Sequence, residues 1–503
     1  MTNLRLSSLF ILFFLPSLFA VELSTNEEAL DTQGLKNDKL FQLDNTNGLS
    51  LYQAIIFSIE SNQKVRASKQ RVLQAKQKVE EAFSGHLPTV DLAGNAGYEA
   101  RSFTPDDSTV SAPQTDRFHY KKTELYLNIK ENIWAGGAIE NQVDEQKQKL
   151  AATMYDYQND VENVAIEMIE TYFDVVYGKI ALKVNQKNME DFQKVLEIMQ
   201  IKEKNGAATK GDLNFIRANV DNAKTELIRT ETTLSNALSF YTYLLEAKQS
   251  TLLPYETTVP LHISDVLTSI KLADENNAKI QRQKAYISAA TYSFEAQKGS
   301  YSPTVDFLIN GESRNEYDDG VGQRDKGSVL LSFNYNLYKG GKDEATSLRL
   351  FAQMNEYKYT LADEKRKLTF EIKVLHQSLN SIQASLKLTE NEVISARKVV
   401  NSYWLAFKEG TQDLQALQLA LRNLNRAELD YVNFQRSLYV DNFKLLQNTG
   451  DLLKFLDISY DNRAEDFQQG KVNIWESRYK ESALFEDEGY TETPVDTNST
   501  QNL

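Results

Sequence analysis

The feature that most constrains this fold is a strand pattern that ends at a double glycine and passes directly into a very long helical pattern. It occurs twice, in residues 121–137 (KKTELYLNIKENIWAGG) and residues 326–341 (KGSVLLSFNYNLYKGG). Apolar and polar side chains alternate before both glycine pairs, which is typical of a strand with two different faces. A chain built from such strands and such helices does not fit an ordinary compact domain.

The long helices are predicted from apolar residues that recur every seven positions. A strict seven-residue repeat holds one seam of a helix against its partners and implies left-handed supercoiling. No proline interrupts residues 138–205, so a helix there would be roughly 100 Å long. The first series is Met154, Val161, Met168, Val175, Leu182, Met189 and Leu196.

Each long helix is expected to form a hairpin with the helix that follows it. Gly206 breaks the helix over 138–205, and Asp212 is a suitable N-cap for a second helix over 212–249. Helices over 342–408 and 412–456 repeat this arrangement around Gly410. Because both turns are short, the two helices of each pair should run antiparallel.

The complete pattern is an internal duplication. Pro88-Thr89-Val90-Asp91 recurs as Pro303-Thr304-Val305-Asp306, and Asn62 matches Asn277, both at a shift of 215 residues. Gly136-Gly137 recurs as Gly340-Gly341 at a shift of 204. The difference falls in a loop between two strands, where changes of length are well tolerated. Repeat 1 over 49–249 and repeat 2 over 265–456 therefore share one architecture.

Within each repeat we expect a helix, two strands, a long helix and a return helix. The first helix of repeat 1 spans 49–83, and residues 250–264, with two prolines, form a linker. The expected strands are residues 89–100 and 122–134 in repeat 1, and residues 304–314 and 327–338 in repeat 2.

The two ends of the chain differ from the repeats. Residues 1–20 have the pattern of a secretory signal peptide, with Arg5, an apolar run and Ala20 at a possible cleavage point. Residues 21–48 are polar and are expected to be flexible. Residues 457–503 form an acidic tail without heptads, expected to be partly disordered.

Composition excludes several classes of function. The formal net charge of −14 argues against nucleic-acid binding, and an exported chain without cysteine has no disulfides. The sequence has no phosphate-binding glycine loop and no HExxH motif, so we expect neither an enzyme nor a cofactor. No metal site is expected either, because the four histidines lack metal-ligand spacing; they are His86, His119, His262 and His376.

The repeated motifs resemble the TolC-like outer-membrane channel (efflux protein) family. The matching segments are PTVDLAGNAGYE and PTVDFLINGES, the joints NIWAGG and NLYKGG, and the turns KEKNGAATKGDL and FKEGTQDLQAL. The resemblance covers about residues 49–456. It implies a homotrimer in which each chain gives four strands to one twelve-stranded barrel. It also implies a helical tunnel across the periplasm, a periplasmic adaptor protein and an inner-membrane transporter as partners.

The resemblance thus implies a fold class that is mainly α, with a membrane β-barrel continued by a coiled-coil tunnel. The residues themselves also support the trimeric barrel. Four strands cannot close a barrel, and open sheet edges are not tolerated in lipid. Three copies give an even number of strands within the range of outer-membrane barrels. Outer-membrane lipid would then contact one strand face, Val329, Leu331, Phe333, Tyr335 and Leu337, and the pore would contact Ser332, Asn334 and Asn336.

Two groups of site residues follow from this interpretation. Gly136, Gly137, Gly340 and Gly341 are expected to supply the backbone freedom of a strand-to-helix bend. The resemblance implies that the tunnel entrance lies around the hairpin turns, where the candidate residues are Gly206, Asp212, Gly410, Asp413, Phe407 and Gln412. For Asp212 a role as a simple helix N-cap is an equal alternative.

The expected function is therefore passage: a passive exit duct of a three-part export system in the outer membrane, extending into the periplasm. Type I protein secretion is the preferred assignment, and multidrug or small-molecule efflux through the same duct is the alternative. A soluble periplasmic coiled-coil scaffold is the alternative from another class. It explains the heptads and the signal sequence but leaves the duplicated strands unexplained.

Overall fold

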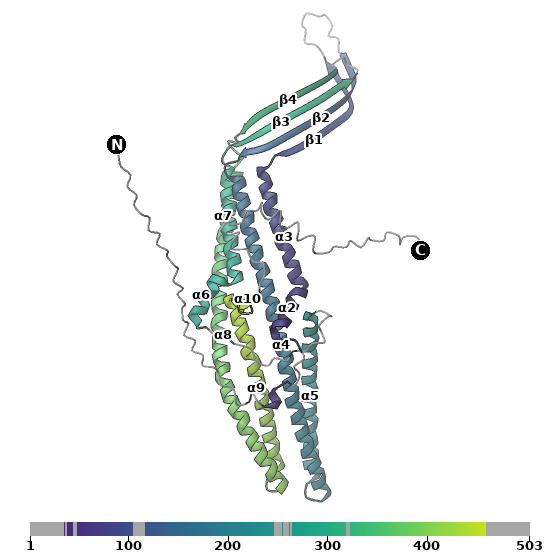
Figure 1. Ribbon diagram of the computed structural model, residues 1–503, viewed down its shortest axis with the longest axis vertical. Helices are drawn as coiled ribbons and strands as arrows, with labels where there is room; N and C mark the ends of the chain where they lie inside the picture. Colours follow the sequence, from purple (N-terminus) through teal and green to yellow (C-terminus); the bar gives the residue numbers. More distant parts are fainter. Residues whose placement is uncertain are drawn as a thin grey trace, which may run out of the picture.

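The computed structural model describes residues 35, 38–43, 48–103, 116–245, 254, 261, 264–317 and 322–458. In these residues one sheet lies at the end of an elongated array of helices, and two helical hairpins point away from it (Figure 1). The same order of elements occurs in each half of the chain. The structure is therefore mostly helical, and the duplication read from the sequence is visible in the elements.

The sheet contains four antiparallel strands in the order β1-β2-β3-β4. They are β1 (Thr89–Phe103), β2 (Asp116–Trp134), β3 (Thr304–Tyr317) and β4 (Gly322–Asn334). The first strand of repeat 2 pairs directly with the second strand of repeat 1, so the duplicated units are joined side by side. Strands β1 and β4 leave two open edges within the described chain.

The predicted strand bounds need two corrections. All four strands extend beyond their predicted loop ends, because the backbone ladder continues through residues whose side chains do not alternate, such as the opposed pair Arg314 and Arg324. Strand β4 stops at Asn334 rather than at residue 338, because its partner β3 begins opposite Asn334, at Thr304. Tyr335 and Leu337, predicted to be strand residues, therefore lie outside the sheet.

The two hairpins are α4 (Ala138–Lys204) with α5 (Lys210–Leu245), and α8 (Lys342–Glu409) with α9 (Leu414–Thr449). Helix α9 does not continue to residue 456 as predicted. Gly450 adopts a left-handed conformation with φ 79°, and among the described residues the short α10 (Leu452–Phe455) follows it. Helix α5 begins two residues before its predicted start, and α9 begins two residues after it.

The helix predicted over residues 49–83 is instead two helices, α2 (Leu51–Ser61) and α3 (Gln63–Phe83). The side chain of Asn62 between them accepts the backbone N–H groups at the start of α3, as an N-cap does. Asn277 does the same between α6 (Val266–Asn276) and α7 (Ala278–Gly299). The matched asparagines are therefore matched helix breaks.

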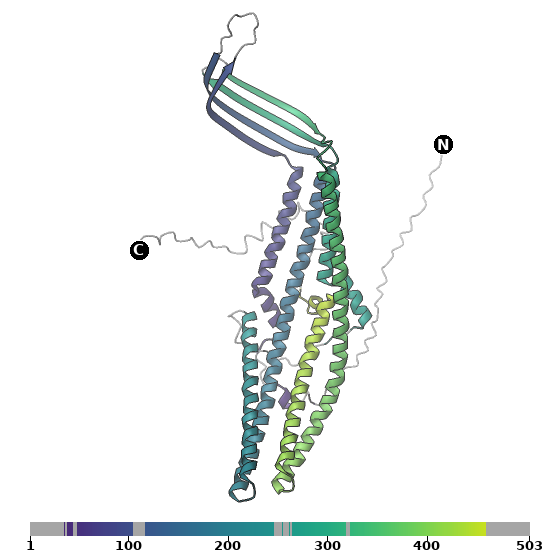
Figure 2. The same cartoon turned by 180° about the vertical axis from the view of Figure 1, so that it is seen from behind.

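The helices form a curved layer below the sheet (Figures 1 and 2). Near the sheet, α3 packs on α4, α4 on α7, and α7 on α8. Farther from the sheet, α5 packs on α4, α4 on α9, and α9 on α8. Helix α8 thus borders the layer over its whole length, and α3 and α5 border the opposite side.

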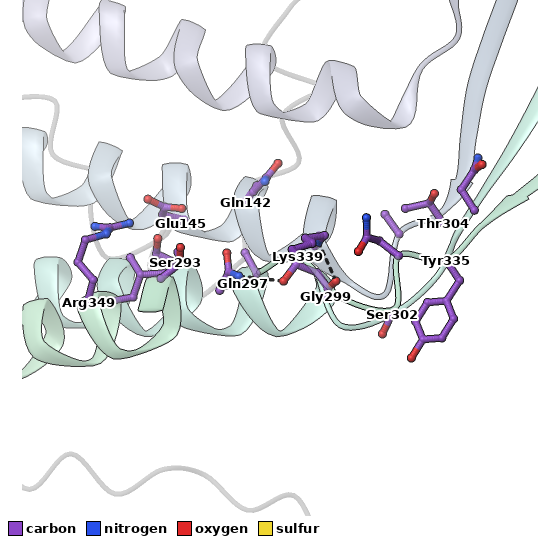
Figure 3. Close-up of a pocket in the computed structure, with 18 residues that line it drawn as sticks. Gln142, Glu145, Ser293, Gln297, Gly299, Ser302, Thr304, Tyr335, Lys339 and Arg349 are labelled. Carbon is purple, nitrogen blue, oxygen red and sulfur yellow. Dashed lines mark hydrogen bonds between the residues drawn. The ribbon is translucent and has the colours of Figure 1, made fainter. Parts of the chain in front are cut away.

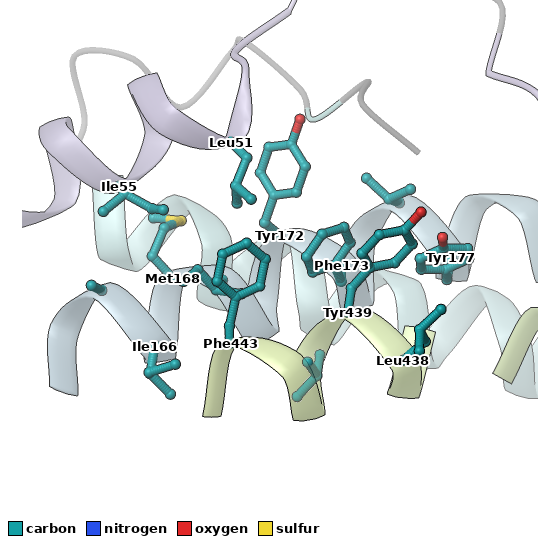
Figure 4. Packing of buried hydrophobic residues seen from close by; sticks show 14 of the residues in the cluster. Leu51, Ile55, Ile166, Met168, Tyr172, Phe173, Tyr177, Leu438, Tyr439 and Phe443 are labelled. Atoms are coloured by element: carbon teal, nitrogen blue, oxygen red, sulfur yellow. The ribbon is translucent and has the colours of Figure 1, made fainter. Parts of the chain in front are cut away.

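The main core lies midway along α4, where aromatic rings from α4 and α9 interleave (Figure 4). The rings of Phe173 and Tyr439 stack with centroids 5.0 Å apart, and Phe443 lies against the same face of α4. The fully buried Tyr172 donates its hydroxyl to the carbonyl of Leu49 at 3.1 Å. This cluster fixes the position where both hairpins and α2 meet.

Part of the segment expected to be flexible, residues 21–48, is instead packed on the helices. Phe41 in the short helix η1 (Lys39–Phe41) is 5% exposed, and its ring meets Tyr431 of α9 edge-on at 5.1 Å. The carboxylate of Asp38 pairs with Arg397 of α8. Burial of one aromatic ring and one ion pair therefore holds residues 38–43 against the helices, although the polar composition of residues 21–48 suggested mobility.

Several predictions fall outside the described residues, among them the signal peptide over 1–20, most of the linker over 250–264 and the tail from residue 459. Among the described residues, none of the helices combines the length and the apolar character needed to cross a membrane. The same residues hold no group of three histidine or acidic side chains arranged to bind a metal ion.

Candidate functional site

The strand-to-helix joints are built on four glycines in left-handed conformations. Gly136 and Gly340 both have φ 64°, and Gly137 and Gly341 have φ 78° and 80°. Other residues adopt this region only at a cost, so the double glycine is needed where the chain turns from sheet into helix. Gly137 and Gly341 are also the N-cap residues of α4 and α8.

The two faces of the sheet differ in chemistry. One face presents apolar side chains in rows that cross all four strands, such as Val90, Ile129, Ile309 and Val329. Most of these large side chains are exposed in the single chain, although they are apolar. Examples are Val90, Leu92, Leu125, Val329, Leu331 and Phe333, each at least 50% exposed.

The other face is polar and held by ion pairs between strands. Glu124 of β2 accepts Lys122 at 2.8 Å and Arg314 of β3 at 2.5 Å. Lys122 also reaches Glu99 of β1 at 2.9 Å. Closer to the helices, Asp306 of β3 is 4% exposed and binds two side chains of β2. One face therefore suits water and the other suits an apolar environment.

A cavity of about 710 Å³ with a mixed polar and apolar lining lies where α4, α7 and α8 meet the sheet (Figure 3). Lys339 lines it, donating to the carbonyl of Ser300 at 3.2 Å and pairing with Asp343 at 3.2 Å. Gln142, Glu145, Arg349 and Asn334 also line it. The polar residues of this lining come both from the end of the sheet and from the helices.

At the far end, the two hairpin turns have the same backbone geometry. Gly206 and Gly410 are left-handed, with φ 76° and 80°. One residue later in each turn, the N–H of Ala207 bonds to the Lys202 carbonyl at 2.7 Å, and that of Thr411 to the Ala406 carbonyl at 2.9 Å. Both helices therefore end in the Schellman arrangement that glycine favours.

The structure assigns the helix caps of the two turns differently from the sequence. Thr209, not Asp212, caps α5. Asp212 lies three residues later, and its carboxylate accepts the hydroxyl and the N–H of Thr209 at 2.7 and 3.1 Å. These bonds hold the pKa of Asp212 below its usual value. In α9 the cap is Asp413 itself, which accepts the Ala416 N–H at 2.7 Å.

Phe407 and Gln412 occupy different environments although both flank the second turn. Phe407 is only 2% exposed. Lys202 of α4 donates to its carbonyl at 3.0 Å and lies 4.2 Å from the centre of its ring. Gln412 is half-buried, and its N–H bonds to the Ala406 carbonyl at 3.2 Å. Phe407 thus links the two hairpins rather than lining an open surface.

Sequence reasoning missed two polar contacts between helices because each involves residues that are distant in the chain. Asn219 of α5 donates to Gln418 of α9 at 3.3 Å, and both are buried. Glu428 of α9 is 3% exposed and accepts Arg397 of α8 at 2.8 Å. The local sequence pattern gives no signal for such contacts.

Comparisons with known proteins agree with this geometry. A family model described as "Outer membrane efflux protein" matches residues 57–239 and again residues 269–451. The two matches cover well over half of the chain and fall one in each repeat.

Similar individual proteins are distant in sequence. The proteases secretion protein PrtF of Dickeya chrysanthemi is 18% identical over 412 residues, covering 79% of this chain and 86% of that protein. The outer membrane protein VceC of Vibrio cholerae has a TM-score of 0.68 at 16% identity, covering 80% of this chain and 96% of the other. The CmeC outer membrane channel of Campylobacter jejuni gives 0.69 at 15%, covering 86% and 89%.

Proposed function

Because the chain belongs to the outer membrane efflux protein family, we propose that three copies form one passive exit duct of a tripartite export system. The chain is an outer-membrane protein that extends into the periplasm, and it is not an enzyme. A soluble periplasmic scaffold is therefore the wrong interpretation of the heptads.

The observation that carries this proposal is the four-stranded sheet with two open edges, one apolar face and one ion-paired polar face. Unpaired strand edges are not stable in lipid, so further strands must come from other copies. Three copies supply twelve strands from the four of each chain, an even number typical of outer-membrane barrels. The polar face would then surround water.

The bordering helices support assembly as well. Apolar side chains are exposed along α8 and α5, which lie at opposite sides of the helical layer. Neighbouring copies would bury the side chains Leu348, Tyr359, Phe370, Leu388 and Leu405 of α8, and Phe215, Ile228, Phe240 and Tyr243 of α5.

The hairpin tips would form the entrance to the duct. Asp212 and Asp413 lie beside Gly206 and Gly410, where three copies would gather six carboxylates near one axis. Phe407 and Gln412 would set how firmly the tips are held closed. This is also the end that would meet a periplasmic adaptor protein and, through it, an inner-membrane transporter.

Protein secretion is our preferred assignment of cargo. Its support is the likeness to a proteases secretion protein across most of both chains, at 18% identity. Export of small toxic molecules through the same duct is the alternative, favoured by the name of the family. Both cargo classes fit a polar passage, so an experiment in cells is needed to distinguish protein secretion from small-molecule efflux.

Three experiments test the proposal. Purified protein in planar lipid bilayers should give discrete conductance steps, and a trimer should be recovered from the outer membrane. Deletion of the gene should then leave one or more secreted proteins inside the cell. Unchanged protein secretion together with increased sensitivity to toxic compounds would overturn the secretion assignment in favour of efflux. Absence of conductance would overturn the duct itself.

A further inference from the structure

The duplication places the same two motifs in each half of the chain, yet only one pair of them meets within the described residues. Asn132 of the NIWAGG motif lies opposite Asp306 of the PTVDF motif, where β2 pairs with β3. The amide of Asn132 donates to Asp306 at 2.8 Å, and Lys130 pairs with the other oxygen at 3.1 Å. A buried aspartate is thus satisfied across the junction between repeats.

The other two members of these motifs lack this contact. Asp91, which matches Asp306, lies on the edge strand β1, is exposed and has no polar partner among the described residues. Asn336, which matches Asn132, follows the opposite edge strand β4. Its side-chain oxygen accepts the Tyr338 N–H at 3.1 Å, while its amide N–H groups find no acceptor in the described part of the chain.

We propose that Asn336 of each copy donates to Asp91 of the next copy, in the register that Asn132 and Asp306 show within the chain. This inference rests on the proposed function, in which copies close the sheet. It adds the residues that recognise one another and the alignment of the strands. The partner is a second copy of this chain, and the contact is incomplete without it.

The matched glycines at the two strand-to-helix joints, Gly136 and Gly340, give independent support. A Cβ on Gly136 would lie 2.4 Å from the Ser302 Cβ and 3.0 Å from the Gly299 carbonyl oxygen, so repeat 2 packs closely over this turn. Its match, Gly340, has the same φ but no described atom within 4 Å of such a Cβ. In the proposed register, residues 84–87 of the next copy would cover Gly340 as residues 299–302 cover Gly136.

The end of β4 gives further support. Strand β2 continues to Trp134, whereas β4 stops at Asn334, four residues short of the position that matches Trp134. Three of the four residues that follow are large, apolar or aromatic, and exposed: Tyr335 at 51%, Leu337 at 83% and Tyr338 at 82%. Pairing with the start of the next β1 would extend β4 through these residues and explain their strand-like alternation.

The register is specific and differs from a simple extension of the sheet. A straight row through the four strands joins Asp91, Asn128, Asn310 and Ser328. The proposed contact places Asp91 of the next copy opposite Asn336, eight residues farther along the chain than Ser328. A closed barrel requires such a stagger, because its strands are tilted to the axis.

Cysteine cross-linking tests this register cleanly because the natural chain contains no cysteine. D91C/N336C, oxidised or treated with a short thiol-reactive linker in outer membranes, should give covalent trimers that survive boiling and are lost on reduction. The matched control D91C/S328C has both residues on the same polar face, but in the straight register. N132C/D306C should link only within one chain.

A charge test complements the cross-linking. N336D would place a carboxylate opposite Asp91 at three interfaces, and like charges across paired strands destabilise them. The temperature at which the trimer dissociates in detergent should fall, and the second change in D91N/N336D should restore it. The control D325N removes a charge from β4 well away from the proposed contact.

The outcomes separate this inference from the proposed function. Covalent trimers from D91C/N336C but not D91C/S328C support the register. Cross-linking through S328C, or none with either pair while the natural chain forms trimers, overturns the register and leaves the duct intact. If the natural chain yields no trimer in the outer membrane, the proposed function fails and the register fails with it.

Discussion

Gly450 provides a quantitative test of the packing between the two ends of repeat 2. It ends α9 in a left-handed conformation with φ 79°. A Cβ at this position would lie 2.5 Å from the carbonyl carbon of Asn276 and 2.8 Å from the backbone nitrogen of Asn277. These are backbone atoms of the corner between α6 and α7, so no side-chain rotation can relieve the overlap.

Gly206 is the matched control for a substitution at Gly450. It is left-handed with φ 76°, but no described atom lies within 4 Å of the position that a Cβ would take. The left-handed conformation costs a residue with a Cβ about 1–2 kcal/mol, and this cost applies to both G206A and G450A. Overpacking adds about 1–3 kcal/mol for G450A alone, for a total of about 2–5 kcal/mol.

The measurement is denaturant unfolding of the purified protein, followed by the far-ultraviolet circular dichroism of the helices. G450A should lower the free energy of unfolding by about 1–3 kcal/mol more than G206A does. The corner is also tied by hydrogen bonds from Asn276 to Asp451 and from Asn277 to the Asn448 carbonyl. Equal losses for G206A and G450A would refute the reasoning, because they would mean that this corner moves freely.

Three further predictions concern charged groups of the helices. R397A leaves the carboxylate of Glu428 buried without its main partner, and it should lower the free energy of unfolding by about 3–5 kcal/mol. The control R366A removes one member of an exposed ion pair and should lower it by about 0–1 kcal/mol. Burial raises the pKa of Glu162 from 4.5 to about 7. Between these two pH values the folded protein keeps a proton on Glu162 that the unfolded chain has released. Stability should therefore fall as the pH rises from about 4.5 to 7, and E162Q should remove this slope and stabilise the protein by ~3 kcal/mol at pH 8. D413A should weaken cation selectivity in planar bilayers and, by loss of the N-cap, cost about 1 kcal/mol, whereas D413S should change selectivity alone.

The elements that the sequence predicted well are those with a strong local signal. The heptads and the absence of proline placed α4 and α8 to within about one residue, because a long seam of apolar residues has no other favourable period. The break at Asn62 was missed because an asparagine inside an apolar repeat does not distinguish a cap from a solvated position. Its side chain becomes a cap only where the backbone has already left the helix.

At the candidate site, the sequence identified the glycines but not the roles of the polar residues. Positive φ is a property of single residues, so the paired glycines could be recognised from the sequence alone. The caps could not, because Thr209 and Asp413 occupy matched positions with different side chains. The acidic side chain of Asp212 predicts a cap, but in the structure Asp212 supports the cap residue Thr209 from three residues away.

The proposed assembly explains why β4 ends at Asn334 although its sequence pattern predicts a strand to residue 338. Alternation over residues 327–338 is a property of the sequence, and selection acts on the sequence in the assembled state. The single chain offers β3 as a partner only as far as Thr304, so the ladder must stop at Asn334 although the pattern continues. The part of the β4 pattern that extends beyond β3 therefore indicates how far β1 of the next copy should pair with it. By the same logic, the open space at Gly340 and the carboxylate of Asp91, which has no polar partner within the described chain, belong to one contact surface. Covalent linkage at that surface is what the cysteine pair measures.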